Sequence, residues 1–234
     1  MTTALQFHQV GGGYGTTQVL HGVDLVVPAG TTVALLGANG AGKSTLLKVA
    51  AGLIRPTGGR VIMDGRDITE QPEHIRARHG LCLVPEGRSI FRQLSVRENL
   101  AMFVGGRRVG EAVDRAAALF PILGERLAQL AGTMSGGQQQ MLALCRAVVT
   151  DARVIMADEL SMGLAPIVLD EIFAAVKALS DEGRSILLVE QYATRAVSVA
   201  DYVYIMHKGR MVFVGEPEQC LEEHLFERYV GSVA

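Results

Sequence analysis

The segment GANGAGKST, at residues 37–45, constrains the fold of this chain more than any other part of its sequence. The apolar run from Thr32 to Leu36 precedes it and is typical of a buried strand. Apolar residues at helical spacing follow it, at Leu46, Leu47, Val49, Ala50 and Leu53. A buried strand, a glycine-rich loop and a helix are therefore expected in direct succession, which favours an α/β core.

The glycine-rich loop carries the complete pattern G-x-x-x-x-G-K-[ST], at Gly37, Gly42, Lys43 and Ser44. Glycines let backbone N–H groups surround phosphate oxygens, and Lys43 would place a positive charge against the β- and γ-phosphates. The Ser44 hydroxyl is suited to Mg²⁺. The pattern predicts a phosphate-binding loop. A glycine-rich turn without function is the alternative, and the pattern alone defines neither the nucleotide nor the reaction.

A second apolar run, Val154 to Ala157, ends in two acidic residues, Asp158 and Glu159. An aspartate at the end of a strand suits Mg²⁺, usually through water. Glu159, one residue further, could polarise a water for in-line attack on a γ-phosphate. A solvated acidic pair at a strand end is the alternative, but the phosphate-binding loop earlier in the chain favours the catalytic interpretation.

The segment MSGGQQQMLAL, which begins at residue 134, predicts a second helix whose amino terminus could bind an anion. Ser135 and Gln138 have the spacing of a capping box. Gly136 and Gly137 lie in the first turn, where side chains would block close approach. Free N–H groups and the helix dipole favour an anion there, yet no lysine accompanies this helix. The sequence thus contains two candidate phosphate-binding helix starts.

The composition is that of a folded protein, because 49% of the 234 residues are hydrophobic and 20% are charged. A net charge of −2 gives no electrostatic basis for nucleic-acid binding. No apolar run reaches 18 residues and the first residues, MTTALQFHQV, lack a basic region, so neither a transmembrane helix nor a signal peptide is expected. Three distant cysteines, Cys82, Cys145 and Cys220, favour packing roles and a reducing compartment over disulfides or metal.

Hydrophobic patterning outlines the rest of the fold. Residues from about 4 to 30 alternate around glycine turns and predict antiparallel strands, and YIMHKGRMVFVGE predicts a hairpin turning at Lys208-Gly209. SILLVEQ predicts a buried strand, and IVLDEIFAAVKALSDEGR an amphipathic helix. RENLAMFV and EAVDRAAALFPILGERLAQLA are helical around a break at Gly105-Gly106. The stretch from about 88 to 149 is therefore expected to be an inserted helical subdomain, with additional core helix as the alternative.

Taken together, GANGAGKST, MSGGQQQ and VIMADE resemble, in this order and spacing, the motifs of ATP-binding cassette (ABC) ATPases, over essentially the whole chain. Ser-Gly-Gly-Gln is the signature of that family. LVPEGRSIFRQLSVRENLAM, SMGLAP and LLVEQ further resemble the ATPase subunits of branched-chain amino-acid importers, and among them the paralogue with VPEGR and VEQ. Leu160 stands where the family usually has proline, and Ala157 thins the strand beside Asp158.

The resemblance implies an α/β fold, with a P-loop NTPase (RecA-like) core, an N-terminal antiparallel β subdomain and an inserted α-helical subdomain. Residues 1–87 and 150–234 would form the nucleotide-binding core with the β subdomain. Residues 88–149 would form the helical subdomain that carries the signature. The whole chain, 1–234, would be a single ABC ATPase domain.

The resemblance also assigns a site for ATP and Mg²⁺. The phosphates would be held by Asn39, Gly40, Ala41, Gly42, Lys43, Ser44 and Thr45. Tyr14 falls where the family stacks an aromatic ring on adenine, with a simple turn tyrosine as the alternative. Ser135, Gly136, Gly137 and Gln138 would bind the ATP that is held by Lys43 of another ATPase chain in a head-to-tail pair.

Three further positions match elements of the family that respond to ATP. Glu86 falls in the loop that usually carries glutamine and senses Mg²⁺ and the membrane partner. Met162 to Ala165 occupies the loop that communicates across the dimer. Gln191 occupies the switch position, usually histidine, that faces the γ-phosphate. The expected catalytic set is therefore Glu159, Lys43 and Gln191, with Ser44, Asp158 and Glu86 near the metal.

The implied protein is the ATP-hydrolysing motor subunit of an importer, peripheral on the cytoplasmic face of the plasma (inner) membrane. Its partners would be transmembrane permease subunits, a second ATPase subunit and, indirectly, a periplasmic or lipid-anchored substrate-binding protein. Phe91 and Leu94 could contact the permease or could equally lie in the interior. Alternatives are an ABC ATPase for urea, amides or an exported lipid, a cassette acting in DNA repair or translation, and a scaffold that no longer hydrolyses ATP.

Overall fold

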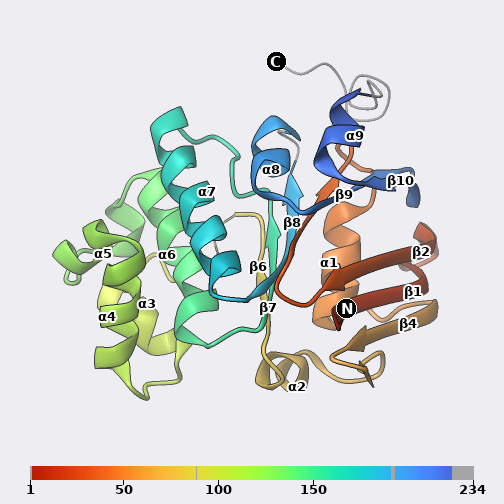
Figure 1. Ribbon diagram of the computed structural model, residues 1–234. Coiled ribbons are helices and arrows are strands. Elements are labelled where there is room, and N and C mark those ends of the chain that lie inside the picture. Colours follow the sequence, from red (N-terminus) through yellow and green to blue (C-terminus); the bar gives the residue numbers. More distant parts are fainter. Residues whose placement is uncertain (1, 88, 191–192, 223–234) are drawn as a thin grey trace.

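The computed structural model describes residues 2–87, 89–190 and 193–222, which form two sheets with helices on both sides (Figure 1). The central sheet has the strand order β10-β9-β3-β8-β7-β6. Its strands are β3 (Thr32–Leu36), β6 (Leu81–Val84), β7 (Val154–Asp158), β8 (Ser185–Glu190), β9 (Tyr202–His207) and β10 (Arg210–Gly215). All neighbours pair in parallel except β10, which returns antiparallel along β9 at the edge.

The second sheet is antiparallel and has the order β2-β1-β4-β5. Its strands are β1 (Thr3–Tyr14), β2 (Thr17–Pro28), β4 (Gly58–Met63) and β5 (Arg66–Asp67). The predicted strands near the amino terminus are thereby confirmed. The predicted hairpin at Lys208-Gly209 is confirmed as well, because it joins β9 to β10.

Alternate residues of β3 face two different cores. Val33 and Leu35 pack with the second sheet and with α1 (Lys43–Ala51), whereas Ala34 and Leu36 pack with α6 (Gly136–Val149) and α7 (Pro166–Asp181). Helices α1 and α6 therefore cover opposite faces of the central sheet (Figure 1). This two-sided burial explains why the run from Val33 to Leu36 is apolar throughout.

The remaining helices extend the two sides of the sheet. Beyond α6, at the left of Figure 1, lie α3 (Val96–Phe103), α4 (Val109–Leu119) and α5 (Pro121–Glu125). A 3-10 turn, η1 (Ala131–Thr133), leads into α6. The others are α2 (Glu73–Arg78), α8 (Ala193–Val199) and α9 (Pro217–Glu222). The helical segment expected from residue 111 onward is divided after Leu119, because Pro121 begins a new helix.

Other expectations from the sequence can be compared directly. Among the described residues, Cys82, Cys145 and Cys220 form no disulfide and are buried, in agreement with packing roles. The break at Gly105-Gly106 is confirmed, because both residues have positive φ between α3 and α4. No helix in the described part of the chain combines the length and the apolar character that crossing a bilayer requires.

Candidate nucleotide-binding site

The phosphate loop, residues 37–42, joins β3 to α1 and is shaped by close packing. A Cβ atom at Gly37 would lie 2.3 Å from the Met206 carbonyl oxygen, so only glycine fits there. Gly42 has a φ of +111° and is the N-cap of α1, where no side chain caps the helix. The first N–H groups of α1 therefore have no side-chain acceptor and remain suited to an anion.

The turn between β9 and β10 supports the phosphate loop from outside. The Gly209 N–H donates to the Ala41 carbonyl over 2.8 Å, and the Gly209 carbonyl accepts from the His21 N–H over 2.9 Å. A Cβ atom at Gly209 would lie 1.8 Å from the Val19 carbonyl. Strand β2, the phosphate loop and the β9–β10 turn are thus fixed against one another by backbone hydrogen bonds and close packing.

Lys43 is the first residue of α1 and is only 4% exposed. Its Nζ donates to the carbonyl oxygens of Gly37, over 2.7 Å, and Ala38, over 3.2 Å. The Glu159 Oε1 atom lies 4.0 Å from the same Nζ. Burial lowers the pKa of Lys43, while the carboxylates of Glu159, Asp158 and Glu190 oppose that shift. An incoming phosphate would add negative charge and favour the protonated form.

Asp158 and Ser44 meet at the carboxyl end of the central sheet. Asp158 ends β7 and is 4% exposed, and the Ser44 side chain hydrogen bonds to its carboxylate. Burial, with smaller contributions from the nearby Glu159 and Glu86 carboxylates, raises the pKa of Asp158 to about 6, although the Ser44 hydrogen bond and Lys43 oppose that shift. The Asp158 Oδ1 atom is buried and finds no hydrogen-bond acceptor or donor partner among the described residues.

These residues fit a divalent cation. A buried carboxylate oxygen without a partner is costly unless a ligand completes it. Within the described chain, no group of three or more histidine, cysteine, aspartate or glutamate side chains could hold a metal alone. A site with few protein ligands suits Mg²⁺, which is usually bound by one or two carboxylates together with substrate phosphates and water.

Glu159 follows β7 in a conformation that is rare for its residue type. Its φ is +48°, in the left-handed region, and its N–H donates to the Val189 carbonyl over 2.9 Å. The side chain is 13% exposed. It borders a hollow of about 190 Å³ that is also lined by Glu86, Gly87, Ile90, Arg92, Gln139, Gln140 and Met162. Glu86 and Glu159, predicted from separate motifs, therefore line one space.

The helix start that is predicted as a second phosphate site has the capping box expected from the sequence. The Ser135 Oγ accepts from the Gln138 N–H over 3.3 Å, and the Gln138 Oε1 accepts from the Ser135 N–H over 3.2 Å, which completes a capping box. Gly137 has a packing reason of its own, because a Cβ atom there would lie 2.3 Å from the Val168 Cγ1 of α7. The helix start lies on the opposite face of the sheet from α1.

The other predicted site residues take varied positions. Tyr14 ends β1 with 49% of its surface exposed, and the Lys48 Nζ lies 5.8 Å from its ring centroid. Asn39 and Gly40 are exposed at the tip of the phosphate loop, and Thr45 is buried in α1. Met162 is exposed at the start of the loop that ends at Ala165, the N-cap of α7. Gln191 lies outside the described residues.

One buried carboxylate beside the site was not predicted from the sequence. Glu190 ends β8 and is completely buried. Burial raises its pKa to about 7, and hydrogen bonds from Ser161 oppose that shift. The available signal was a carboxylate at the end of an otherwise apolar strand, the same pattern that singled out Asp158.

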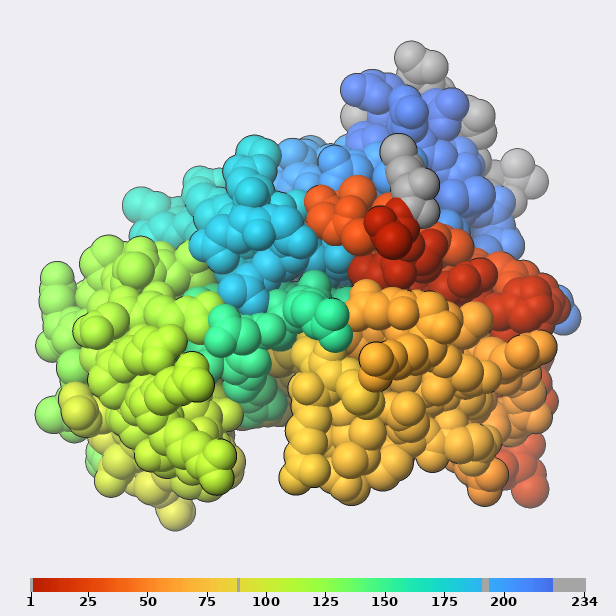
Figure 2. All heavy atoms as spheres, turned by 60° about the horizontal axis from the view of Figure 1, so that its bottom comes forward, coloured from red at the N-terminus to blue at the C-terminus, as the bar shows by residue number. Residues whose placement is uncertain are grey.

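An apolar groove opens on another face of the molecule. It measures about 560 Å³ and separates α3 and the end of α6 from α2 and β6, and Figure 2 shows this hollow between the lime and orange segments. Its lining includes the exposed side chains of Leu53, Phe91 and Met102. Phe91 therefore lies at the surface of this groove, whereas Leu94 is half-buried and not part of its lining.

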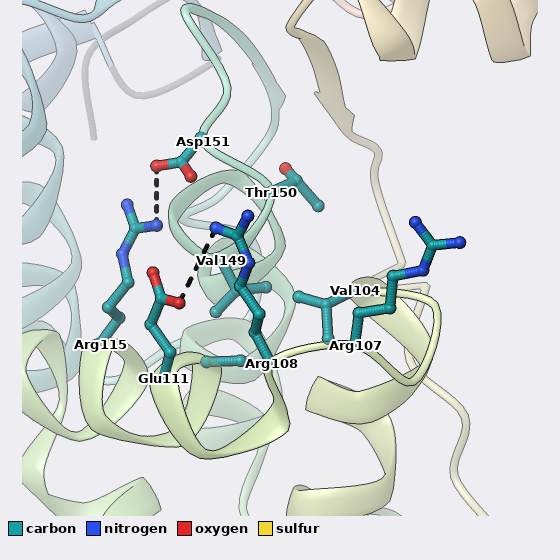
Figure 3. A pocket seen from close by; sticks show the side chains of 9 residues that line it. Val104, Arg107, Arg108, Glu111, Arg115, Val149, Thr150 and Asp151 are labelled. Atoms are coloured by element: carbon teal, nitrogen blue, oxygen red, sulfur yellow. Dashed lines mark ion pairs between the residues drawn. The ribbon is translucent and has the colours of Figure 1, made fainter.

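A third hollow, of about 250 Å³, has a charged lining (Figure 3). Arg115 pairs with Asp151 over 2.7 Å, and Arg108 lies 3.9 Å from Glu111. The Arg107 side chain points away from these two pairs in Figure 3. The paired charges compensate one another, so this hollow offers no evident acid, base or nucleophile.

Comparison with known proteins gives consistent results. The profile of the family described as ABC transporter matches residues 20–161. The branched-chain amino acid transport ATP-binding protein BraG of Pseudomonas aeruginosa is 43% identical over 211 residues, which cover 89% of this chain and 91% of BraG. The probable branched-chain amino acid transport protein LivF of Archaeoglobus fulgidus is 38% identical and is covered to 93%, with 92% of this chain aligned.

Relatives with other names and a solved structure extend this similarity. The lipopolysaccharide export ATP-binding protein LptB of Haemophilus influenzae is 32% identical, with 94% of this chain and 93% of LptB covered. A nucleotide-free ATP-binding cassette from an ABC transporter superposes with a TM-score of 0.83 at 25% identity, and 95% of each chain is covered. The predicted α/β fold is thereby confirmed.

Proposed function

The chain belongs to the ABC transporter family and is an ATPase subunit, and on this premise we propose that it powers an importer of branched-chain or related small amino acids. The observation that carries the proposed cargo is the 43% and 38% identity, over most of the chain, to proteins named for branched-chain amino acid transport. The sequence elements VPEGR and LLVEQ support the same assignment.

ATP is the proposed substrate of the phosphate loop. The backbone N–H groups of residues 39–45 and the positive Lys43 side chain would contact its phosphates. Lys43 already donates to two carbonyl oxygens, at Gly37 and Ala38, and would exchange or share these acceptors with phosphate oxygens. Tyr14, nearly half exposed at the end of β1, would stack on the adenine ring.

Ser44 and Asp158 would hold Mg²⁺, with Glu86 close enough to influence their charge. A bound Mg²⁺ would neutralise charge on the phosphate oxygens during transfer. The unpartnered Asp158 Oδ1 supports this role. Glu159, at the edge of the same hollow as Glu86, would accept a hydrogen bond from a water and hold it in line with the γ-phosphate. On the basis of the sequence alone, Gln191 is the proposed switch residue that would face the γ-phosphate.

A second ATPase subunit would complete each site. The Ser135–Gln138 helix start has no lysine of its own and lies on the opposite face of the sheet from Lys43. In a head-to-tail pair, this start would therefore bind the ATP held by the phosphate loop of the other subunit. ATP would hold the pair together, and hydrolysis would loosen it.

The apolar groove is the proposed docking surface for a segment of a transmembrane permease. Exposed Phe91 and Met102 on one wall and Leu53 on the other provide an apolar surface of the kind that marks interaction sites. The groove lining includes Pro85 and Phe91, which lie on either side of Glu86 in the sequence, so the docked segment could respond to the site. The chain would then sit peripherally on the cytoplasmic face of the plasma (inner) membrane, and a substrate-binding protein would act on it only indirectly.

Uptake measurements in cells of the source strain would test the cargo. Deletion of the gene should abolish transport of radiolabelled leucine, isoleucine or valine, and the wild-type gene should restore it. A Glu159→Gln gene, expressed at the same level, should not restore it. Normal amino-acid uptake together with a defect in lipopolysaccharide export would favour the cargo named for the LptB relative. That result would leave the ATPase assignment intact.

A further inference from the structure

The carboxylate of Glu190 accepts hydrogen bonds from the two residues that directly follow Glu159, Leu160 and Ser161. It is 0% exposed, and its Oε1 atom accepts from the Ser161 N–H over 3.1 Å. Its Oε2 atom accepts from the Ser161 hydroxyl, and the Leu160 N–H also hydrogen bonds to the carboxylate. A single side chain at the end of β8 thus satisfies three donors from two consecutive residues.

Strand β8 also holds Glu159 itself, through Val189, the residue before Glu190. The β7–β8 ladder ends at the pair Asp158 and Val189, and the Val189 carbonyl then accepts from the Glu159 N–H over 2.9 Å. Residues 159, 160 and 161 are therefore all held by the last two residues of β8. This matters because Glu159 has a φ of +48°, and such a conformation persists only where the surroundings determine it.

The choice of a carboxylate at this position needs a reason. A fully buried acid is costly, and an apolar side chain would suit an interior strand better. Burial and the charge of the Glu159 carboxylate both raise the pKa of Glu190, so they disfavour its charged form. Its advantage is that a carboxylate accepts several hydrogen bonds at once. Leu160 also contributes an N–H that proline, usual at this place in the family, would lack.

We propose, on the premise that Glu159 polarises the attacking water, that Glu190 is a positioning residue for it. Through Ser161 and Leu160, Glu190 fixes the backbone after Glu159, and this keeps the Glu159 carboxylate opposite Lys43, 4.0 Å away. The same bonds fix the point from which the exposed loop Met162 to Ala165 departs. Glu190 itself need not touch ATP or the water.

Steady-state ATP hydrolysis by the full-length chain tests this role. Glu190→Leu removes all three acceptor contacts, and kcat should fall by about 10- to 100-fold because small misplacements of a catalytic group are costly. Ser161→Ala removes only the hydroxyl contact and should lower kcat severalfold. For both variants, KM for ATP and the binding of a fluorescent ATP analogue should stay within about twofold of wild type, because the phosphate loop is unchanged.

A conservative variant separates hydrogen bonding from general structural damage. Glu190→Gln keeps an oxygen that can accept from the Ser161 N–H, and the hydroxyl of Ser161 can turn to accept from the amide. It should therefore retain kcat within about threefold of wild type. The double variant Glu190→Leu/Ser161→Ala should be no slower than Glu190→Leu, because both changes break one network. Ser198→Ala, which removes a serine hydroxyl bond in α8, should behave as wild type.

Two results would overturn the proposal. The first is a wild-type kcat for both Ser161→Ala and Glu190→Leu when both variants are folded. If Glu190→Leu does not fold, a wild-type kcat for Ser161→Ala is sufficient to overturn the proposal. The other is a loss of kcat that follows the loss of folded protein in circular dichroism. Glu159→Gln, measured beside them, reports on the proposed function itself. If it turns over ATP normally, the premise is overturned together with the role of Glu190, whereas an inactive Glu159→Gln with active Glu190 variants removes only the positioning role.

Discussion

Helices α3 and α6 begin with the same capping box but differ in charge. In α3 the Ser95 Oγ accepts from the Glu98 N–H over 3.2 Å, as the Ser135 Oγ accepts from the Gln138 N–H in α6 over 3.3 Å. Glu98 returns a carboxylate to the Ser95 N–H and hydroxyl, each over 2.7 Å. Gln138 returns only a neutral amide oxygen, and two glycines follow its serine.

The difference separates a helix end that is complete from one that can accept a ligand. The negative charge of Glu98 compensates the positive end of the α3 dipole within the helix itself. Nothing in the first turn of α6 supplies such a charge. The α6 start is thus held in helical geometry while its electrostatic potential remains available to an external phosphate. The two helix starts have the same capping geometry. They are distinguished by the residue at the third helical position, which is Glu98 in α3 and Gln138 in α6.

The largest expected effect is the loss of ATP turnover in Glu159→Gln. This variant should trap ATP, so that the two helix starts can be compared in the ATP-bound state. Glu159→Gln should lower ATP turnover by about 10²–10⁴-fold, because a general base is lost while the phosphate loop is unchanged. Under these conditions hydrogen exchange of the amides at residues 136–138 should slow on addition of ATP with the partner subunit present. The amides at residues 96–98 should not change. Equal protection of both helix starts would remove the distinction.

Steric blockage of the two helix starts should have unequal consequences. Ser135→Arg places a bulky side chain where the partner's ATP would bind, and ATP-dependent pairing of the subunits should fall by at least tenfold in ultracentrifugation. Ser95→Arg costs α3 a comparable cap, roughly 1 kcal/mol, but should leave pairing intact. ATP trapping at the partner's phosphate loop that Ser135→Arg does not diminish would show that this helix start has another purpose.

Exchanging the charges gives a smaller and more selective test. Gln138→Glu makes the α6 start resemble that of α3, and its carboxylate should repel the γ-phosphate and weaken ATP-dependent pairing by about five- to tenfold, or about 1 kcal/mol. Glu98→Gln makes the reciprocal change and should only slightly lower the melting temperature. Stronger pairing in Gln138→Glu would contradict the electrostatic interpretation.

The last comparison, which affects stability and not activity, concerns two carboxylates that each accept hydrogen bonds from the N–H and hydroxyl of one serine. Hydrogen bonds from Ser95 lower the pKa of exposed Glu98, whereas burial raises the pKa of Glu190 to about 7. Between about pH 4.5 and 7 the folded chain therefore binds a proton at Glu190 that the unfolded chain does not, and rising pH destabilises the fold. Glu190→Gln cannot titrate there.

Urea unfolding at several pH values measures this difference. Relative to wild type, Glu190→Gln should gain stability as the pH rises from 5 to 8, by about 1–3 kcal/mol. Asp158 titrates in the same range in both proteins and cancels in the comparison. A constant difference across this range would mean that Glu190 does not change its protonation state there.

Much of the fold follows from short-range patterns. The run from Thr32 to Leu36 is apolar because both faces of β3 are covered, and the structure assigns a strand to these same residues. The capping box at Ser135 is local in sequence and forms as predicted. The break before Pro121 was missed because the apolar pattern continues across it, although proline favours the first turn of a new helix.

The features that could not be predicted from the sequence depend on contacts between segments that are distant along the chain. Glu190 and Ser161 lie 29 residues apart and meet only because β8 is placed beside β7. The sequence predicts that Gly137 leaves room for a ligand, and the structure adds a second reason for glycine there, because an added Cβ atom would clash with Val168. That second reason depends on how α7 packs on α6. The groove between α2 and α3 likewise arises from two segments that are each unremarkable in sequence.

The support of the phosphate loop by the β9–β10 turn has a consequence for synthesis of the chain. The loop leaves the ribosome early, but Met206 and Gly209, which shape it, follow about 165 residues later. At about 5–20 residues per second this delay is roughly 10–30 s. A nascent chain should therefore remain unable to bind ATP, and unable to pair prematurely, until this hairpin has emerged. Filter binding of labelled ATP to stalled ribosome complexes, with the hairpin inside or outside the exit tunnel, would reveal the moment at which the loop becomes competent.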